Sequence, residues 1–393
     1  MTTADPDLVP LDEVSLSLST ASPTGLPYDR LAEARATCPV VTSKVHGLNV
    51  VTTYQDVRFV LEHPEIFSSE HPALIGAVPV RMPPLDSDPP QQQEFRKLLT
   101  PFFTRKHFAA YESDMRRIAQ EAIATWVDAG RCEFVSSFAV PYTAAVLAQL
   151  VFGETDPGRL AEATEVVVAV AENQSDADFA ALAQLAGKYL AERAQSGEAT
   201  DDILGALVGG TLGDRPLTSE EQMGVIAVLF LGGLDTTRNA ISNITRHIAE
   251  DHSLETRLRD PAWTKQDLEE FLRFESPVVT MARTVLREVE LGGRMFHPGD
   301  RISIVYGSAN RDESRFANAD QLRFDRPPSS NVAFGLGIHR CIGMHLARFQ
   351  ITVAFEELLS RITRLRLAAG FEVIMSPGTS LGPSRLEIEF DRV

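Results

Sequence analysis

One cysteine stands in a glycine-rich loop, directly before an apolar helical pattern. Cys341 lies between Gly335 and Gly343, and apolar residues recur at helical spacing from position 346 onward. The N-terminus of a helix carries partial positive charge, which favours a thiolate over a thiol. The glycines let a large flat group approach the main chain closely. Together these features indicate an axial thiolate ligand for haem iron.

Three other interpretations of this loop stay open. A lone cysteine is most often a small buried hydrophobic residue. His339, Cys341 and His345 could form an incomplete zinc site, although no fourth ligand lies nearby in the sequence. A Cys–His pair could also act as a nucleophile.

A second group of residues interrupts a long helical pattern that opens with the capping box Thr218-Ser219-Glu220-Glu221. Gly232 and Gly233 each cost a helix about 1 kcal/mol relative to alanine, so their presence needs a reason. Close passage over a haem face is one reason, and a tight helix-packing contact is the alternative. Asp235 and Thr236 follow directly, and a threonine hydroxyl can leave the i−4 carbonyl to donate to a ligand.

The segment from Phe334 to Arg348 matches the pattern Phe-Gly-x-Gly-x-His-x-Cys-x-Gly-x-x-Leu-Ala-Arg throughout. The chain therefore resembles a cytochrome P450 of the soluble bacterial type. In Phe67–Pro72 and Leu231–Thr236 its motifs are nearest to the camphor hydroxylase type. The resemblance implies a mainly α fold with small β-sheets (α+β) and haem b between the long central helix and the Cys-loop helix. Cys341 would be its thiolate axial ligand.

The resemblance also implies roles for residues outside the loop. Thr236 would donate a hydrogen bond during oxygen activation, and Asp235 would feed protons by way of water. Gln92 stands where the family usually has a histidine, so one expected haem contact becomes neutral. The expected cofactor-binding residues are Cys341, His339, Arg283, Arg96, Phe334, Gly335 and Gly343, and a structural clamp is expected from Glu270, Arg273 and Arg326.

Substrate contacts are expected from segments that face the distal side of the haem. Most of these residues are apolar, which predicts a small and largely hydrophobic substrate. Each of them could equally be an ordinary core residue. The expected contacts are Val228, Leu231, Gly232, Val278, Val279, Met281, Thr379 and Ser380.

Composition narrows the partners and the compartment. A net charge of −17 argues against nucleic acid or an anionic membrane as the main partner, because both require a positive surface. Three scattered cysteines indicate a reducing cytoplasm rather than a disulfide framework. The apolar runs, such as 225–231, fall short of the roughly 18 residues that a membrane span needs. We therefore expect a cytoplasmic protein, with no membrane partner, that works as a monomer.

The chain is expected to hold a loosely ordered segment over residues 1–25 and a single haem domain over 26–393. We find no linker to a fused reductase, so electrons should come from a separate ferredoxin that an NAD(P)H-dependent reductase reduces. A basic patch for this ferredoxin could form from Arg340, Arg348, Lys97 and Lys106. A hairpin is predicted at 40–42 and 48–52, helices at 54–64 and 105–126 with a proline-rich loop between them, further helices up to 207, and strands at 284–291, 301–305 and 386–390.

The resulting hypothesis is a monooxygenase that uses O2 to hydroxylate or O-demethylate a monoterpene-like or small aromatic compound. One alternative is a peroxide-driven peroxygenase, which would take peroxide directly. Another is a haem-thiolate sensor without catalytic activity, which would have little use for a proton relay.

Overall fold

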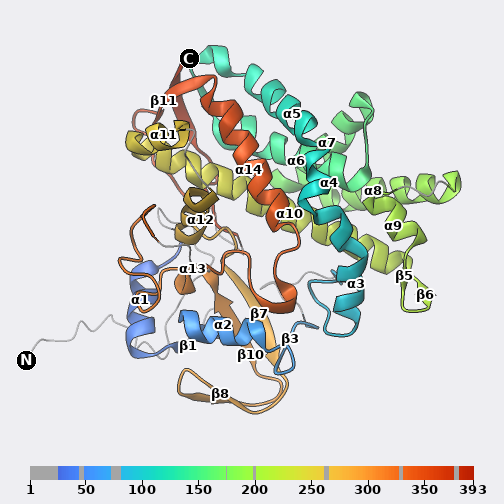
Figure 1. Ribbon diagram of the computed structural model, residues 1–393, viewed down its shortest axis with the longest axis vertical. Coiled ribbons are helices and arrows are strands. Elements are labelled where there is room, and N and C mark those ends of the chain that lie inside the picture. Colours follow the sequence, from blue (N-terminus) through green and yellow to red (C-terminus); the bar gives the residue numbers. More distant parts are fainter. Residues whose placement is uncertain are drawn as a thin grey trace, which may run out of the picture. The chain divides into compact units, whose positions relative to one another are not determined.

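The computed structural model describes residues 25–43, 48–71, 81–173, 175–197, 201–260, 265–326, 331–375 and 380–393 (Figure 1). The chain divides into two compact units, each built from several segments. The first comprises residues 1–79, 264–341 and 374–381, and the second comprises residues 80–263, 342–373 and 382–393.

The first unit is organised by a five-stranded sheet with the strand order β1-β2-β10-β7-β3. Its outer hairpin and its central strands come from distant parts of the chain, and β10 runs parallel to β2 but antiparallel to β7. The strands are β1 (Val40–Ser43), β2 (Leu48–Val51), β3 (Phe67–Ser68), β7 (Thr280–Val285) and β10 (Arg301–Val305), with a separate hairpin of β8 (Val289–Leu291) and β9 (Arg294–Phe296). The helices are α1 (Tyr28–Thr37), α2 (Tyr54–Glu62), α12 (Lys265–Phe274), α13 (Tyr306–Ala309) and the 3-10 turn η5 (Gly337–His339).

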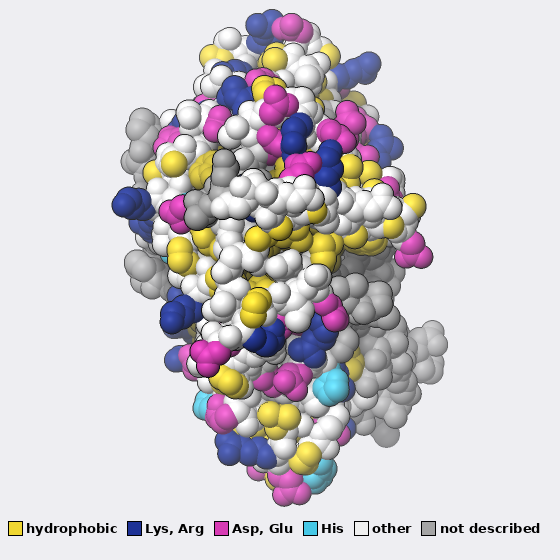
Figure 2. All heavy atoms as spheres, turned by 90° about the vertical axis from the view of Figure 1, so that its right-hand side faces the viewer, with side chains coloured by type: hydrophobic (Ala, Val, Ile, Leu, Met, Phe, Trp, Pro, Cys, Tyr) yellow, Lys and Arg dark blue, Asp and Glu magenta, His cyan; other side chains and the backbone are white. Residues whose placement is uncertain are grey.

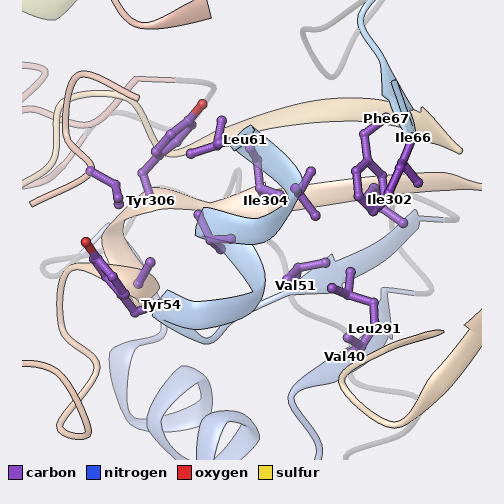
Figure 3. Packing of buried hydrophobic residues seen from close by; sticks show 14 of the residues in the cluster. Val40, Val51, Tyr54, Leu61, Ile66, Phe67, Leu291, Ile302, Ile304 and Tyr306 are labelled. Carbon is purple, nitrogen blue, oxygen red and sulfur yellow. The ribbon is translucent and has the colours of Figure 1, made fainter. Parts of the chain in front are cut away.

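The core of the first unit lies between this sheet and α2 (Figure 3). Ile302 and Ile304 alternate along β10, so their side chains share one face of the sheet, and both are fully buried. Val57 on α2 is equally buried. Thr53 begins α2 by accepting a hydrogen bond from the Asp56 N–H at 3.2 Å. The cap and the apolar contacts together hold α2 in a defined position in this unit.

The second unit is mostly helical. It contains α3 (Gln91–Leu99), α4 (Arg105–Ala109), α5 (Glu112–Ala124), α6 (Val140–Phe152), α7 (Pro157–Asn173), α8 (Asp176–Ser196), α9 (Ile203–Gly209), α10 (Ser219–Glu250), α11 (His252–Arg259) and α14 (Met344–Leu359). A small sheet has the order β11 (Ile362–Leu367), β12 (Glu387–Arg392) and β4 (Arg131–Glu133), and β5 (Thr211–Leu212) pairs with β6 (Arg215–Pro216).

The long helix α10 begins with the predicted capping box. Thr218 Oγ1 accepts a hydrogen bond from the Glu221 N–H at 3.2 Å, and the Glu221 carboxylate accepts one from the Thr218 N–H at 2.8 Å. The helix then continues without a break through Gly232 and Gly233. Packing against neighbouring helices therefore overcomes the low helix propensity of the two glycines.

The predicted helix over 105–126 is wrong in detail, because the chain forms two helices there. The N–H groups of Ala110 and Tyr111 donate to carbonyls three residues back, which tightens the turn and ends α4. The predicted strand over 284–291 is likewise divided between β7 and β8. The proline-rich loop contains α3, whose first residue follows Pro90. Proline is favoured at helix N-termini, so these prolines mark the start of a helix.

The sequence analysis predicted that the apolar runs are too short to span a membrane, and it overlooked one helical stretch that is long enough. Val135–Phe152 has a mean hydropathy of 1.6 over 18 residues, which meets the length and composition of a membrane span. Polar residues such as Thr143 and Gln149 interrupt this stretch and hide it from a search for continuous runs. Because 78% of the stretch is buried inside the structure, it serves as a core helix of the second unit.

Candidate functional site

The loop that carries Cys341 is held closed by its own backbone. The Cys341 N–H donates to the Phe334 carbonyl at 2.8 Å, and the Gly335 N–H donates to the Val332 carbonyl at 2.8 Å. Gly335 and Gly337 adopt φ angles of +66° and +64°, which side chains disfavour. Among the described residues Cys341 forms no disulfide, and the residue is exposed. The loop therefore presents the Cys341 thiol on a backbone that its own hydrogen bonds hold in place.

Helix α2 sets the position of this loop within the first unit. A Cβ atom added at Gly337 would lie 2.2 Å from the carbonyl oxygen of Leu61, near the end of α2. Real atoms do not approach that closely, so only glycine allows the contact. The turn η5 ends at the half-buried His339, two residues before Cys341.

A buried cation and a buried tyrosine share the neighbourhood of the thiol. Arg283 on β7 is 3% exposed, and its Nη1 donates to the Ala282 carbonyl at 2.8 Å. Tyr306 is 5% exposed. Burial raises the pKa of Tyr306, Arg283 partly opposes this rise, and the Cys341 thiolate adds to it. Sequence reasoning missed Tyr306, because no local motif marks it.

The expected clamp residues form one buried ion-paired set. Glu270 accepts hydrogen bonds from Arg273 Nη2 at 2.7 Å and from Arg326 Nε at 3.1 Å. It also accepts the backbone N–H of Arg323 at 2.8 Å, which sequence reasoning did not foresee. Arg273, only 1% exposed, donates further to the carbonyls of Asn310, Ala319 and Gln321 at 2.8 to 2.9 Å.

On α10, both expected proton-relay residues already have partners. The Thr236 hydroxyl donates to the Gly232 carbonyl at 2.7 Å. Asp235 accepts from Arg238 Nε at 2.9 Å. Arg238 was not predicted, although its i, i+3 spacing from Asp235 could have indicated the pair.

The two adjacent glycines of α10 have different surroundings. A Cβ atom at Gly233 would lie 2.9 Å from Leu147 Cδ2 on α6, which is the helix-packing contact of the alternative interpretation. At Gly232 a Cβ atom would meet no atom of the described residues within 4 Å. Gly232 therefore leaves open surface on α10, whereas Gly233 serves helix packing.

The other expected site residues lie in both units. In the first unit, Val278 pairs with Ser380 in an isolated bridge, Val278 and Met281 are half-buried, Val279 is fully covered, and Phe334 is half-buried. In the second unit, Val228 and Leu231 are half-buried on α10, Arg96 is half-buried and Gln92 buried on α3, and Gly343 is the N-cap of α14. Thr379 lies outside the described residues.

The ligand chemistry fits haem better than zinc. Among the residues that the structure describes, no group of three or more His, Cys, Asp or Glu side chains could hold a metal ion. A single thiol suits a metal that arrives with its own ring of donor atoms, as haem iron does. Arg283 is a buried cation in the same unit as Cys341, and Cys341 is exposed on the glycine loop. The first unit therefore contains a thiol and a buried cation, two groups that suit a haem thiolate site.

Comparisons with known proteins agree with this geometry. Residues 263–377 match the family model described as Cytochrome P450. The chain is 30% identical over 372 residues to the steroid C26-monooxygenase of Mycolicibacterium smegmatis, covering 91% of this chain and 90% of that protein. It is 31% identical over 337 residues to the methyl-branched lipid omega-hydroxylase of Mycobacterium bovis, covering 80% and 77%.

The structure of cytochrome P450 CYP109Q5 from Chondromyces apiculatus matches with a TM-score of 0.86 at 28% identity, covering 98% of this chain and 99% of that one. These relatives are a bacterial steroid C26-monooxygenase, a lipid hydroxylase and a CYP109 member, so the likeness is not specifically to the camphor hydroxylase type. The predicted fold class and the haem b cofactor with a cysteine thiolate ligand are confirmed. The chain belongs to the cytochrome P450 family and is a monooxygenase of that family.

Proposed function

We propose that this protein hydroxylates or O-demethylates a largely apolar substrate, with Cys341 as the haem ligand and electrons from a separate ferredoxin. The observation that carries the proposal is the exposed Cys341 thiol on a loop closed by backbone hydrogen bonds. When bound, a thiolate-ligated haem would cleave the O–O bond of dioxygen, and electron donation from the sulfur favours this cleavage. Arg283, His339 and Arg96 would hold its carboxylates.

Two residues of α10 support a proton relay, although both side chains have other hydrogen-bond partners in this structure. The Thr236 hydroxyl donates to Gly232, and Asp235 is paired with Arg238, so both must exchange partners before they move a proton. We expect Thr236→Ala to keep the substrate-induced spin change but to divert electrons to hydrogen peroxide. The neighbouring Thr237→Ala is the matched control, because Thr237 is buried in the same helix.

The measurement is the ratio of product formed to NADH consumed. Unchanged coupling in Thr236→Ala would contradict the proposed relay. Arg238→Gln frees Asp235 from its partner, and we expect it to alter the pH profile of coupling while haem content stays constant. The same pH profile as in the wild type would exclude a role for this ion pair.

The residues proposed for substrate contact favour an apolar compound. Val228 and Leu231 on α10, and Val278 and Met281 in the first unit, keep part of their apolar side chains accessible. We propose a monoterpene-like or small aromatic substrate. A steroid or branched lipid is the second candidate, because the two curated relatives are named for such substrates. A spin-state titration of the ferric protein with all four classes decides between them, and turnover of the compound that responds tests the result.

A separate ferredoxin and its NAD(P)H-dependent reductase are proposed as the electron source. Arg340, Lys97 and Lys106 are exposed, whereas Arg348 is half-buried and its Nη1 donates to the Met344 carbonyl. On the face shown in Figure 2, Lys and Arg side chains lie among Asp and Glu side chains. Charge reversal by Arg340→Glu should slow reduction by ferredoxin at low salt and leave reduction by dithionite unchanged. Equal slowing of both reductions would contradict docking at Arg340.

The peroxygenase and sensor alternatives are separated by turnover. Product formed with peroxide but not with ferredoxin would favour the peroxygenase, and no product with either would favour the sensor.

We further propose that residues 26–393 act as one haem domain in the cytoplasm and as a monomer. The free thiols of Cys38 and Cys132 fit a reducing compartment. Limited proteolysis and light scattering of the haem-loaded protein test the domain and the oligomeric state.

A further inference from the structure

We propose that the Tyr306 hydroxyl donates a hydrogen bond to a haem carboxylate and, together with Arg283, anchors the edge of the cofactor. This inference rests on the haem site of the proposed function, but not on its substrate or its electron donor. It assigns a role to a buried polar group that neither the sequence motifs nor the core packing explains.

The position of Tyr306 is fixed by the sheet of the first unit. The residue follows the last residue of β10, and its backbone N–H donates to the Val279 carbonyl at 3.0 Å. The ring belongs to the buried core cluster, where it lies beside Leu61 (Figure 3). Figure 3 also shows the hydroxyl pointing away from the apolar side chains of the cluster. The ring is thus a rigid support for a hydroxyl at the edge of the core.

The surroundings of the hydroxyl belong to the Cys341 loop and to β7. A Cβ atom at Gly335 would lie 3.9 Å from the Tyr306 oxygen, so the glycine leaves this side of the hydroxyl clear of a side chain. Arg283 lies on β7, which pairs with β10. Both the Arg283 guanidinium and the Cys341 thiolate act electrostatically on the tyrosine. Tyr306 therefore lies next to Gly335 of the Cys341 loop and within electrostatic range of Arg283.

The hydroxyl has no acceptor within the described part of the chain, where no group forms a hydrogen bond with it. Tyr306 as a residue is only 5% exposed, so a hydrogen bond to its hydroxyl compensates for the water that most of the residue loses. A neutral donor beside a guanidinium is suited to an anionic oxygen. Haem brings such oxygens on its two carboxylates, in the same neighbourhood as the thiolate. A haem carboxylate therefore completes the environment of Tyr306.

The test compares Tyr306→Phe with Tyr54→Phe in the haem-loaded protein. Tyr54 is a matched control, because it lies in the same cluster, is 6% exposed, and packs edge-on against Phe316 at 5.8 Å. Haem transfer to excess apomyoglobin should be about tenfold faster in Tyr306→Phe, the effect of losing one hydrogen bond to a charged group. Tyr54→Phe should release haem at the wild-type rate.

Resonance Raman spectra identify the acceptor. We expect Tyr306→Phe to shift the carboxylate bending band of the haem and to leave the iron–sulfur stretching band in place. With the dimethyl ester of haem, which lacks the carboxylates, the wild type and Tyr306→Phe should release the cofactor at equal rates. The inference would be overturned if Tyr306→Phe and Tyr54→Phe released ordinary haem at the same rate. It would also be overturned if Tyr306→Phe shifted only the iron–sulfur band. Loss of the thiolate signature in the wild type would instead overturn the haem site itself.

Discussion

Glu270→Gln tests whether the buried ion-paired set holds the first unit together. The substitution keeps the size of the side chain but removes the negative charge that faces Arg273 and Arg326, whose side chains are 1% and 10% exposed. Breaking a buried ion pair by removing one partner costs about 3–5 kcal/mol. Arg273 keeps three hydrogen bonds to carbonyls, so we expect about 3 kcal/mol. This is a large part of the roughly 5–15 kcal/mol that stabilises a folded protein.

The assay is urea unfolding followed in parallel by far-ultraviolet circular dichroism and haem absorbance. Glu121→Gln is the matched control, because Glu121 pairs with Arg117 at 3.1 Å within α5 but is 64% exposed. Exposed pairs of this kind contribute less than about 0.5 kcal/mol. If both variants unfold at the same urea concentration, Glu270 carries no more stability than a surface pair, and the reasoning is refuted.

Three further substitutions test individual contacts. Gly337→Ala should sharply lower haem content per chain, because its Cβ atom would lie 2.2 Å from the Leu61 carbonyl at a φ of +64°; normal haem content would contradict this. Gly232→Ala should leave the melting temperature of the apoprotein unchanged or raised, since its methyl group would meet no atom of the described residues within 4 Å; a lower melting temperature would show that other atoms occupy this space. Hydrogen bonds from Arg215 lower the pKa of Glu221 from 4.5 to about 2. Its stabilisation is present above pH 4.5 and disappears toward pH 2, so Glu221→Gln should flatten that part of the acid unfolding curve, and an unchanged curve would argue against the contribution.

The parts of the site that could be predicted are those in which neighbouring residues carry the chemistry. The Cys341 loop combines a thiol with nearby glycines, of which Gly335 and Gly337 have positive φ angles and Gly343 does not. The capping box at Thr218 is likewise local, because its partner Glu221 is three residues away. The clamp is not local, because Arg326 is 56 residues from Glu270, and it was predicted only from the family pattern.

The parts that could not be predicted depend on contacts between distant segments. The Leu61 carbonyl explains why Gly337 must be glycine, yet the two residues belong to segments far apart in the sequence. Tyr306 reads as an ordinary strand residue until Gly335 and Arg283 are placed around it. The pairing of Asp235 with Arg238 was overlooked because such spacings are common on exposed helices. The periodicity of apolar and charged residues along the sequence does not reveal which of these contacts form.

The measurement that tests the central claim most directly is the absorption spectrum of the reduced protein under carbon monoxide, for the wild type and for Cys341→Ser. Cys341→Ser is conservative in size, and the other free thiols, Cys38 and Cys132, remain as internal controls. We expect the wild type to show the long-wavelength Soret band that thiolate ligation gives, and the variant to lose it. A wild-type band at the position given by imidazole ligation, or a variant that keeps the thiolate band, would contradict Cys341 as the haem ligand.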